Sequence, residues 1–67
     1  MTLANRRVQV ARPAERHGTA RGIVGIAYPA VGGLRVAGLY VVDPDDKADL
    51  IKVENLLFSE TELELLT

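Results

Sequence analysis

The sequence predicts an all-β fold, a small five-stranded barrel with a short 3-10 turn before the last strand. Three observations lead to this prediction. The apolar residues are mostly Leu or β-branched and occur in short runs, five of which predict strands. Clusters of Gly, Pro and Asp separate these runs, as turns require. The 67 residues contain no long segment with helical periodicity, and a chain of this length forms one domain.

The first two strands are expected on either side of a polar loop. Residues 8–10 alternate apolar and polar side chains, which predicts a short strand, and Pro13 stops it because proline has no amide to donate. Residues 13–21 show no alternation and predict a loop that can hold a single helical turn. Residues 22–28 are rich in β-branched side chains and predict the second strand, where Gly25 allows a bend or a close backbone approach.

The middle of the chain predicts two further strands. Residues 29–33 contain Pro and two consecutive Gly, which is a turn signature. Residues 34–42 predict the third and longest strand, with a bulge or bend at Gly38. The Asp-Pro-Asp-Asp segment at residues 43–46 is a strong turn signal. The next apolar run, Leu-Ile-Lys-Val at residues 50–53, is expected to be the fourth strand.

The sequence is compatible with two structures for the C-terminal segment. Ser59 and Glu62 have the spacing of a capping box, which favours a helix over residues 59–66. However, the Glu-Leu-Glu-Leu run at residues 62–65 alternates strictly, which favours a strand. We expect a single 3-10 turn over residues 59–62, followed by a short fifth strand.

The composition limits how so small a domain can be stabilised. Chains of about 60 residues remove only ~60% of their unfolded surface from water, and disulfides, metals or partner chains usually add the missing stability. The chain has no cysteine and one histidine, which excludes disulfides and leaves too few ligands for a zinc site built on Cys or His. Association with another chain is the remaining route. No metal or cofactor is expected.

The ends of the chain and its hydropathy predict a cytoplasmic protein. Residues 1–5 are expected to be a loose tail. No apolar run follows Arg6 and Arg7, as a signal peptide would require. No apolar stretch approaches the ~20 residues of a membrane helix, so we expect no membrane association.

The order of features along the chain resembles that of the SH3-like barrels of bacteria and plastids. The similarity rests on Val-Gln-Val at residues 8–10, Gly-Ile-Val at residues 22–24, an acidic turn and a final Glu-Leu-Glu-Leu segment, and it covers residues 6–66. That group includes KOW-type ribosomal modules, a photosystem I peripheral subunit, the variable chain of ferredoxin–thioredoxin reductase and type II dihydrofolate reductases. The resemblance implies a five-stranded barrel. It does not imply reductase activity, because Leu-Ile-Lys-Val at residues 50–53 stands where those reductases have Val-Gln-Ile-Tyr.

The second and third strands have no polar face, which predicts an exposed apolar surface. Successive side chains of a strand point to opposite faces, and both faces of residues 23–28 and 34–42 are mainly apolar. A barrel has one interior, so one of these faces points outwards. We expect it to bind another protein chain through Ile23, Leu39 and Val41. The alternative is that the polar loop and the N-terminal tail cover it.

The charges are divided between the two halves of the chain. Residues 1–33 contain five arginines and one glutamate, a balance of +4, whereas residues 34–67 contain three basic and eight acidic residues, a balance of −5. The halves can neutralise each other in the fold, associate head to tail, or provide a nucleic-acid-binding edge. The candidate nucleic-acid contacts are Arg6, Arg7, Arg12, Arg16 and Arg21.

Catalytic residues are not expected. His17 is the one side chain that titrates near neutral pH without assistance, but no nucleophile adjoins it in the sequence, and we expect a solvated loop histidine. The aspartates of residues 43–49 lack the glycine of an EF-hand loop and fit a solvent-exposed turn.

These observations favour a non-catalytic interaction module, either a homo-oligomer or an accessory subunit of a larger protein. One alternative is an RNA-binding KOW-like module that uses the five arginines. A second is a minimal oligomeric enzyme, because a short chain can enclose a substrate only by association. Its site would lie at a symmetry axis and use Lys52, Tyr28 or Tyr40.

Overall fold

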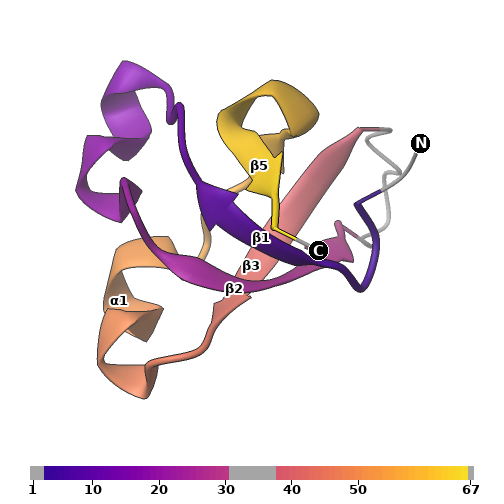
Figure 1. Cartoon of the computed structure of the whole chain (residues 1–67). Helices are drawn as coiled ribbons and strands as arrows, with labels where there is room; N and C mark the ends of the chain where they lie inside the picture. The colour runs from indigo at the N-terminus through magenta and orange to yellow at the C-terminus, as the bar shows by residue number, and fades with distance from the viewer. Residues whose placement is uncertain (1–2, 31–37, 67) are drawn as a thin grey trace.

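The computed structural model describes residues 3–30 and 38–66 and shows five antiparallel strands in one curled sheet (Figure 1). The strands are β1 (Arg7–Val10), β2 (Val24–Pro29), β3 (Leu39–Pro44), β4 (Phe58–Ser59) and β5 (Leu63–Leu65). Their order across the sheet is β4-β3-β2-β1-β5, so the two short C-terminal strands form its edges. The predicted all-β, five-stranded fold is confirmed.

Short helical segments connect the strands. Within the described residues these are η1 (Glu15–Ala20), η2 (Lys47–Asp49), α1 (Leu50–Val53) and η3 (Glu60–Glu62). The expected helical turn in the first loop is therefore present as η1. In Figure 1, η1 and α1 lie at the same end of the sheet, and they are in contact.

The C-terminal segment follows the expected turn and strand. The 3-10 helix η3 is capped by Ser59, whose amide donates to the Glu62 side chain at 3.1 Å. The chain then leaves the helical conformation at Leu63, the first residue of β5. The helix over residues 59–66 is thus excluded, because β5 pairs with β1 from Leu63 to Leu65.

The fourth predicted strand is wrong, because residues 50–53 form the helix α1. The Asp46 side chain accepts a hydrogen bond from the Ala48 amide at 2.9 Å and starts the 3-10 turn η2, which continues directly into α1. The helix ends before Asn55, which has a φ of 64°, a conformation that Asn tolerates better than most residues. Only Val53 of the four helical residues is buried. The apolar Leu50 and Ile51 are exposed, so the apolar run at residues 50–53 is not the buried side of a strand. The fourth strand is β4, later in the chain.

Other boundaries differ by a few residues. The second strand begins at Val24 rather than at Gly22, which has a φ of 87°. Gly25 makes the expected close backbone approach, since a Cβ there would overlap the carbonyl group of Asp43. Gly38, expected as a bulge, occupies a turn immediately before β3 and has a φ of 81°. The predicted turn at residues 29–33 and the start of the third strand lie largely outside the described residues.

The core fills the concave side of the sheet. Its members come from every strand, from η1 and from α1, and the fully buried side chains of largest volume are Phe58, Val8, Val10 and Val53. Leu3 is also a core residue, and its amide hydrogen bonds to the Tyr40 hydroxyl at 3.3 Å. The expectation of a loose tail over residues 1–5 is therefore wrong at Leu3, because its apolar side chain completes the core.

Candidate functional site

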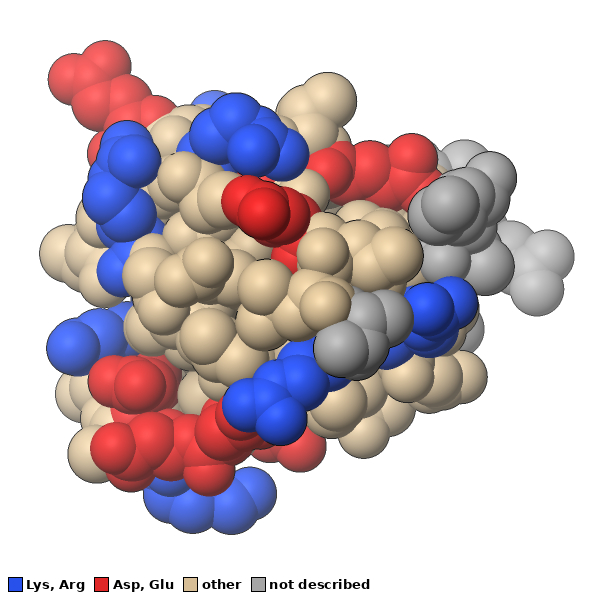
Figure 2. All heavy atoms as spheres, viewed as in Figure 1, with Lys and Arg blue, Asp and Glu red and all other residues tan. Residues whose placement is uncertain are grey.

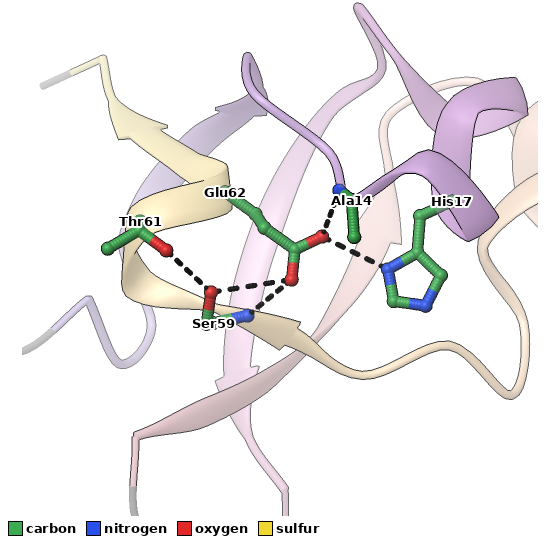
Figure 3. A network of polar contacts seen from close by, with 5 residues as sticks. All are labelled: Ala14, His17, Ser59, Thr61 and Glu62. Atoms are coloured by element: carbon green, nitrogen blue, oxygen red, sulfur yellow. Dashed lines mark hydrogen bonds and ion pairs between the residues drawn. The ribbon is translucent and has the colours of Figure 1, made fainter.

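Glu62 is the centre of a buried polar network that joins two distant segments of the chain (Figure 3). Its Oε1 atom accepts hydrogen bonds from the Ser59 amide at 3.1 Å and from Ser59 Oγ at 3.3 Å. Its Oε2 atom accepts a hydrogen bond from the Ala14 amide at 2.9 Å and lies 3.0 Å from Nδ1 of His17. The carboxylate therefore connects the beginning of η1 to η3.

Two opposing influences set the pKa of Glu62. Burial is the larger single influence and acts to raise the pKa, because it disfavours the charged carboxylate. The hydrogen bonds from the Ala14 amide, the His17 ring and the Ser59 amide favour the charged form. Together they outweigh burial and lower the pKa of Glu62 from 4.5 to about 2. The carboxylate is consequently ionised at neutral pH and has a donor for each oxygen.

His17 is buried, so the expectation of a solvated loop histidine is wrong. The backbone of η1 kinks at His17, with a φ of −106° and a ψ of 17°, and both His17 and Ala20 are buried. The imidazole packs edge-on against Phe58, with the ring centroids 5.1 Å apart. The sequence contains the capping box that identifies Glu62, but no spacing rule connects positions 17 and 62.

The network does not have the connectivity of a hydrolase triad. In such a triad the nucleophilic hydroxyl contacts the imidazole, whereas Ser59 Oγ contacts the Glu62 carboxylate and lies 2.8 Å from Thr61 Oγ1. The main chain adds to the connection, because the Glu62 carbonyl accepts from the amides of Ala11 and Arg12, both at 3.0 Å. The arrangement therefore fits a structural clamp between η1 and η3.

The residues of the hypothetical symmetry-axis enzyme are not brought together on one surface. Tyr40 lies in the core and donates from its hydroxyl to Glu60 at 3.1 Å. Tyr28 lies on the other side of the sheet from Tyr40, opposite Val41 in the strand register, and it is 40% exposed. Lys52 belongs to α1 and pairs with Asp49 at 3.5 Å.

The second candidate site is the convex side of the sheet, which we call the outer face. Alternation along β2 and β3 places the side chains of Tyr40, Val42 and Ala27 inwards and those of the intervening residues outwards. The apolar residues of the outer face are Val24, Ile26, Tyr28, Leu39 and Val41. Of the three predicted interface residues, Leu39 and Val41 lie on this face, with Val41 36% exposed.

The prediction of Ile23 as the third interface residue is wrong. It is 6% exposed and belongs to the core. In the alternating pattern of a strand, residues 23 and 27 lie on the same side, and Ala27 also points inwards. The sequence assigned the inner side of β2 to the interface because both sides of this strand are apolar and alternation alone cannot distinguish them.

Charged residues flank the apolar centre of the outer face. Ile26 of β2 is opposite Arg7 of β1 on one side and opposite Asp43 of β3 on the other. Nη2 of Arg7 also lies 2.7 Å from Oδ2 of Asp45, a residue whose amide bonds to the carbonyl of Val24. Since Arg7 and Asp45 belong to opposite sides of β2, their ion pair crosses this strand. It partly covers the β2 side chains beneath it.

The five arginines do not form one rim. Arg7 lies on the outer face, and Arg12 donates to the carbonyls of Thr61 and Leu63 beside β5, at 3.0 and 3.3 Å. Arg16 is exposed on η1. The two others are Arg6 and Arg21, also exposed. Figure 2 shows blue and red side chains interspersed on the viewed face rather than a single basic patch.

The acidic turn after β3 is held by local contacts. Asp43 lies 3.9 Å from Lys47, Asp46 caps η2, and Asp49 pairs with Lys52. Residues 3–30 and 38–66 contain no group of three or more His, Asp or Glu side chains arranged to hold a metal ion. In the same residues, no helix has the length and apolar character needed to span a membrane.

Neither a protein-family model, nor a curated protein, nor a solved structure matches this chain.

Proposed function

We propose that the protein is a non-catalytic interaction module that binds another protein chain through the outer face of β2 and β3. The observation that carries the proposal is the apolar character of both sides of these strands. The inner side already forms the core with Ala27, Tyr40 and Val42. The outer side nevertheless carries the apolar group defined above, with Tyr28 and Val41 substantially exposed.

The energetic benefit of covering this face is large relative to the size of the domain. Complete burial of one large aliphatic or aromatic side chain contributes roughly 1.5–3 kcal/mol. Small domains have total stabilities of only about 5–15 kcal/mol, and chains of this length are at the low end. Tyr28 is 40% and Val41 36% exposed, so covering each of them contributes roughly 1 kcal/mol, and together with Leu39 they supply an appreciable fraction of the folding free energy.

The resemblance to SH3-like barrels is part of the proposal. The curled five-stranded sheet supports it, since a five-stranded barrel is what the resemblance implies. The proposal places the protein in the cytoplasm. The absence of cysteine is compatible with this, because the fold does not depend on an oxidising environment.

The two alternatives have less support from the contacts. RNA binding depends on cations that neutralise phosphates, but Arg7 is paired with Asp45, and Arg12 donates to main-chain carbonyls and lies 3.9 Å from Glu64. An enzyme site at a symmetry axis is opposed by Tyr40, whose phenol is inside the core.

Site-specific photo-crosslinking tests the proposal without assuming which protein binds. We would replace Tyr28 by p-benzoylphenylalanine, a tyrosine-sized crosslinker, and irradiate cells that produce the variant. The matched control carries the crosslinker at Ile51, which is 77% exposed on α1. We expect a defined covalent adduct from position 28 and none from position 51. The absence of an adduct at position 28, or the same adducts at both positions, contradicts the proposal.

A further inference from the structure

The charges on the outer face have an order that is set by the strand register. At the level of Ile26, the β1 neighbour is Arg7 and the β3 neighbour is Asp43. At this level the outer face is therefore positive on the β1 side of β2, apolar at Ile26, and negative on the β3 side. Val24, Ile26 and Tyr28 are the apolar side chains of β2 on this face, and the Arg7–Asp45 ion pair crosses the strand over part of them.

We propose that the outer face binds a second copy of this chain about a two-fold axis parallel to β2. This inference rests on the proposed function and specifies its partner. A rotation of 180° about such an axis places each β2 against β2 of the second copy. It also exchanges the two sides, so Arg7 of each copy faces Asp43 of the other. One rotation thus creates two equivalent ion pairs on either side of an apolar seam, as an isologous interface requires.

The charges distinguish this axis from the other two-fold arrangement of two facing sheets. An axis that lies in the interface but runs perpendicular to β2, at the level of Ile26, places Arg7 against Arg7 and Asp43 against Asp43. Like charges in direct opposition are destabilising, and such contacts select against a wrong arrangement. The order of charges on this face therefore favours the axis parallel to the strand.

The two charged residues have capacity for contacts with a second copy. A guanidinium group has five N–H donors, and the ion pair with Asp45 uses Nη2 of Arg7 and leaves its side chain 53% exposed. Asp43 is 50% exposed, and its contact with Lys47 is long, at 3.9 Å. Neither internal contact prevents a pair across the interface.

The size of the molecule indicates the strength of the dimer. The molecule measures 27 × 24 × 22 Å, so a single face can bury at most about the ~800 Å² per partner of a standard interface. Interfaces of this size have dissociation constants from roughly micromolar to picomolar, and we expect the dimer at the weak end of this range, where sedimentation equilibrium can measure its dissociation constant.

Charge reversal tests both the partner and the axis. Arg7→Glu places a glutamate against Asp43 of the second copy, and Asp43→Lys places a lysine against Arg7. We expect each single variant to weaken dimerisation at least tenfold. The double variant R7E/D43K restores both pairs with reversed polarity, and we expect its dissociation constant to lie within about threefold of the original. Arg16→Glu on η1 makes the same charge change away from the outer face and serves as the matched control.

Mixing the two single variants separates a contact between copies from an effect within one copy. In the mixed dimer, the glutamate introduced by R7E faces the lysine introduced by D43K, and the unchanged Arg7 faces the unchanged Asp43, so both contacts are favourable. We expect the equimolar mixture to dimerise at concentrations where neither single variant does. Circular dichroism will check that each variant is folded. R7E also loses the internal pair with Asp45, but this loss is present in R7E alone and in the mixture, so it cannot explain dimerisation that occurs only in the mixture.

Any one of the following results would overturn the inference. The first is an unmodified protein that sediments as a monomer up to millimolar concentration. The second is a double variant as weak as the single variants, which would contradict the axis. The third is a mixture that stays monomeric, which would show that residues 7 and 43 of different copies are not in contact. An adduct between position 28 and a different protein, with a monomeric mass in sedimentation, would leave the proposed function intact and refute the second copy as partner.

Discussion

The Glu62 carboxylate and the His17 ring lie 3.0 Å apart, although 45 residues separate them in the chain. The contact holds η1 against η3 and so connects the first loop to the C-terminal turn. Small domains commonly use disulfides for such connections, but this chain has no cysteine. Because both partners are buried, removing either one leaves the other without its partner in a poorly solvated position.

The first prediction concerns the stability of the fold at acidic pH. The folded-state pKa of Glu62 is lowered to about 2, so the carboxylate stabilises the fold fully above its unfolded pKa near 4.5. This contribution, about 3 kcal/mol from the shift, is lost as the pH falls from 4.5 towards 2. We expect the free energy of unfolding, measured in urea, to decrease steeply across this window.

Glu62→Gln provides the comparison for the acid prediction. The amide keeps the shape but has no charge to lose, so we expect a less stable protein at pH 7 whose stability varies less between pH 5 and pH 2. Glu64→Gln, at an exposed position of β5, is the matched control and should keep the original dependence. Equal slopes for all three proteins would show that Glu62 is not the titrating group.

The second prediction separates the packing of His17 from its polar contact. His17→Phe preserves an aromatic ring against Phe58 but removes the donor to Glu62. A hydrogen bond to a charged group contributes about 1.5–3 kcal/mol, so we expect its removal to lower the free energy of unfolding at pH 7 by about 2 kcal/mol. In a double-mutant cycle with Glu62→Gln, the losses should be less than additive. Additive losses would indicate that the two side chains are independent.

The strands and the last turn could be predicted because their signals are local. Residues 8–10 alternate, the Glu-Leu-Glu-Leu run alternates, and Ser59 and Glu62 have capping-box spacing. Each of these patterns depends on neighbours within a few positions, and the structure forms the corresponding elements as β1, β5 and η3.

The clamp and the position of Ile23 could not be predicted for a different reason. The contact between His17 and Glu62 depends on the path of the chain in three dimensions. The inner side of β2 cannot be recognised when both sides are apolar. The helix α1 was missed because the four residues Leu-Ile-Lys-Val at 50–53 are too few to show a period, and the cap at Asp46 decides the local structure.

The third prediction concerns Gly25, which lies opposite Val8 in β1 and Pro44 in β3. A Cβ at this position would lie 2.8 Å from the carbonyl carbon of Asp43 and from Cα of Pro44. These are backbone atoms of β3, so the strand itself must move. We expect Gly25→Ala to destabilise the fold by roughly 1–3 kcal/mol, as overpacked sites do. Gly18→Ala, where a Cβ meets nothing within 4 Å, is the control for thermal unfolding and should melt close to the original temperature.

The fourth prediction concerns the cap that turns residues 47–53 into helix. Asp46→Ala removes the acceptor for the Ala48 amide, and loss of such a cap typically costs about 1 kcal/mol. Asp49→Ala removes only a partly exposed ion pair with Lys52, which is worth roughly 0.3–0.5 kcal/mol. Urea unfolding should therefore rank Asp46→Ala as the more damaging change. The opposite ranking would mean that the cap does not stabilise the helix.

The fifth prediction concerns the free edge of β5. The carbonyl of Glu62 and the amide of Leu66 bond to β1 and the residues next to it, so by alternation the carbonyl of Leu63 points to the open side. There the Arg12 guanidinium donates to it and to the carbonyl of Thr61. Unpaired edges promote pairing with other chains, and this side chain occupies the edge. We expect Arg12→Ala to lower the free energy of unfolding by about 1 kcal/mol and to increase aggregation in light scattering. Arg12→Lys should not restore the original behaviour, because lysine lacks the planar fork that reaches two carbonyls at once. Arg16→Ala makes the same truncation on η1, so an equal increase in aggregation for that variant would contradict the role of Arg12 at the edge.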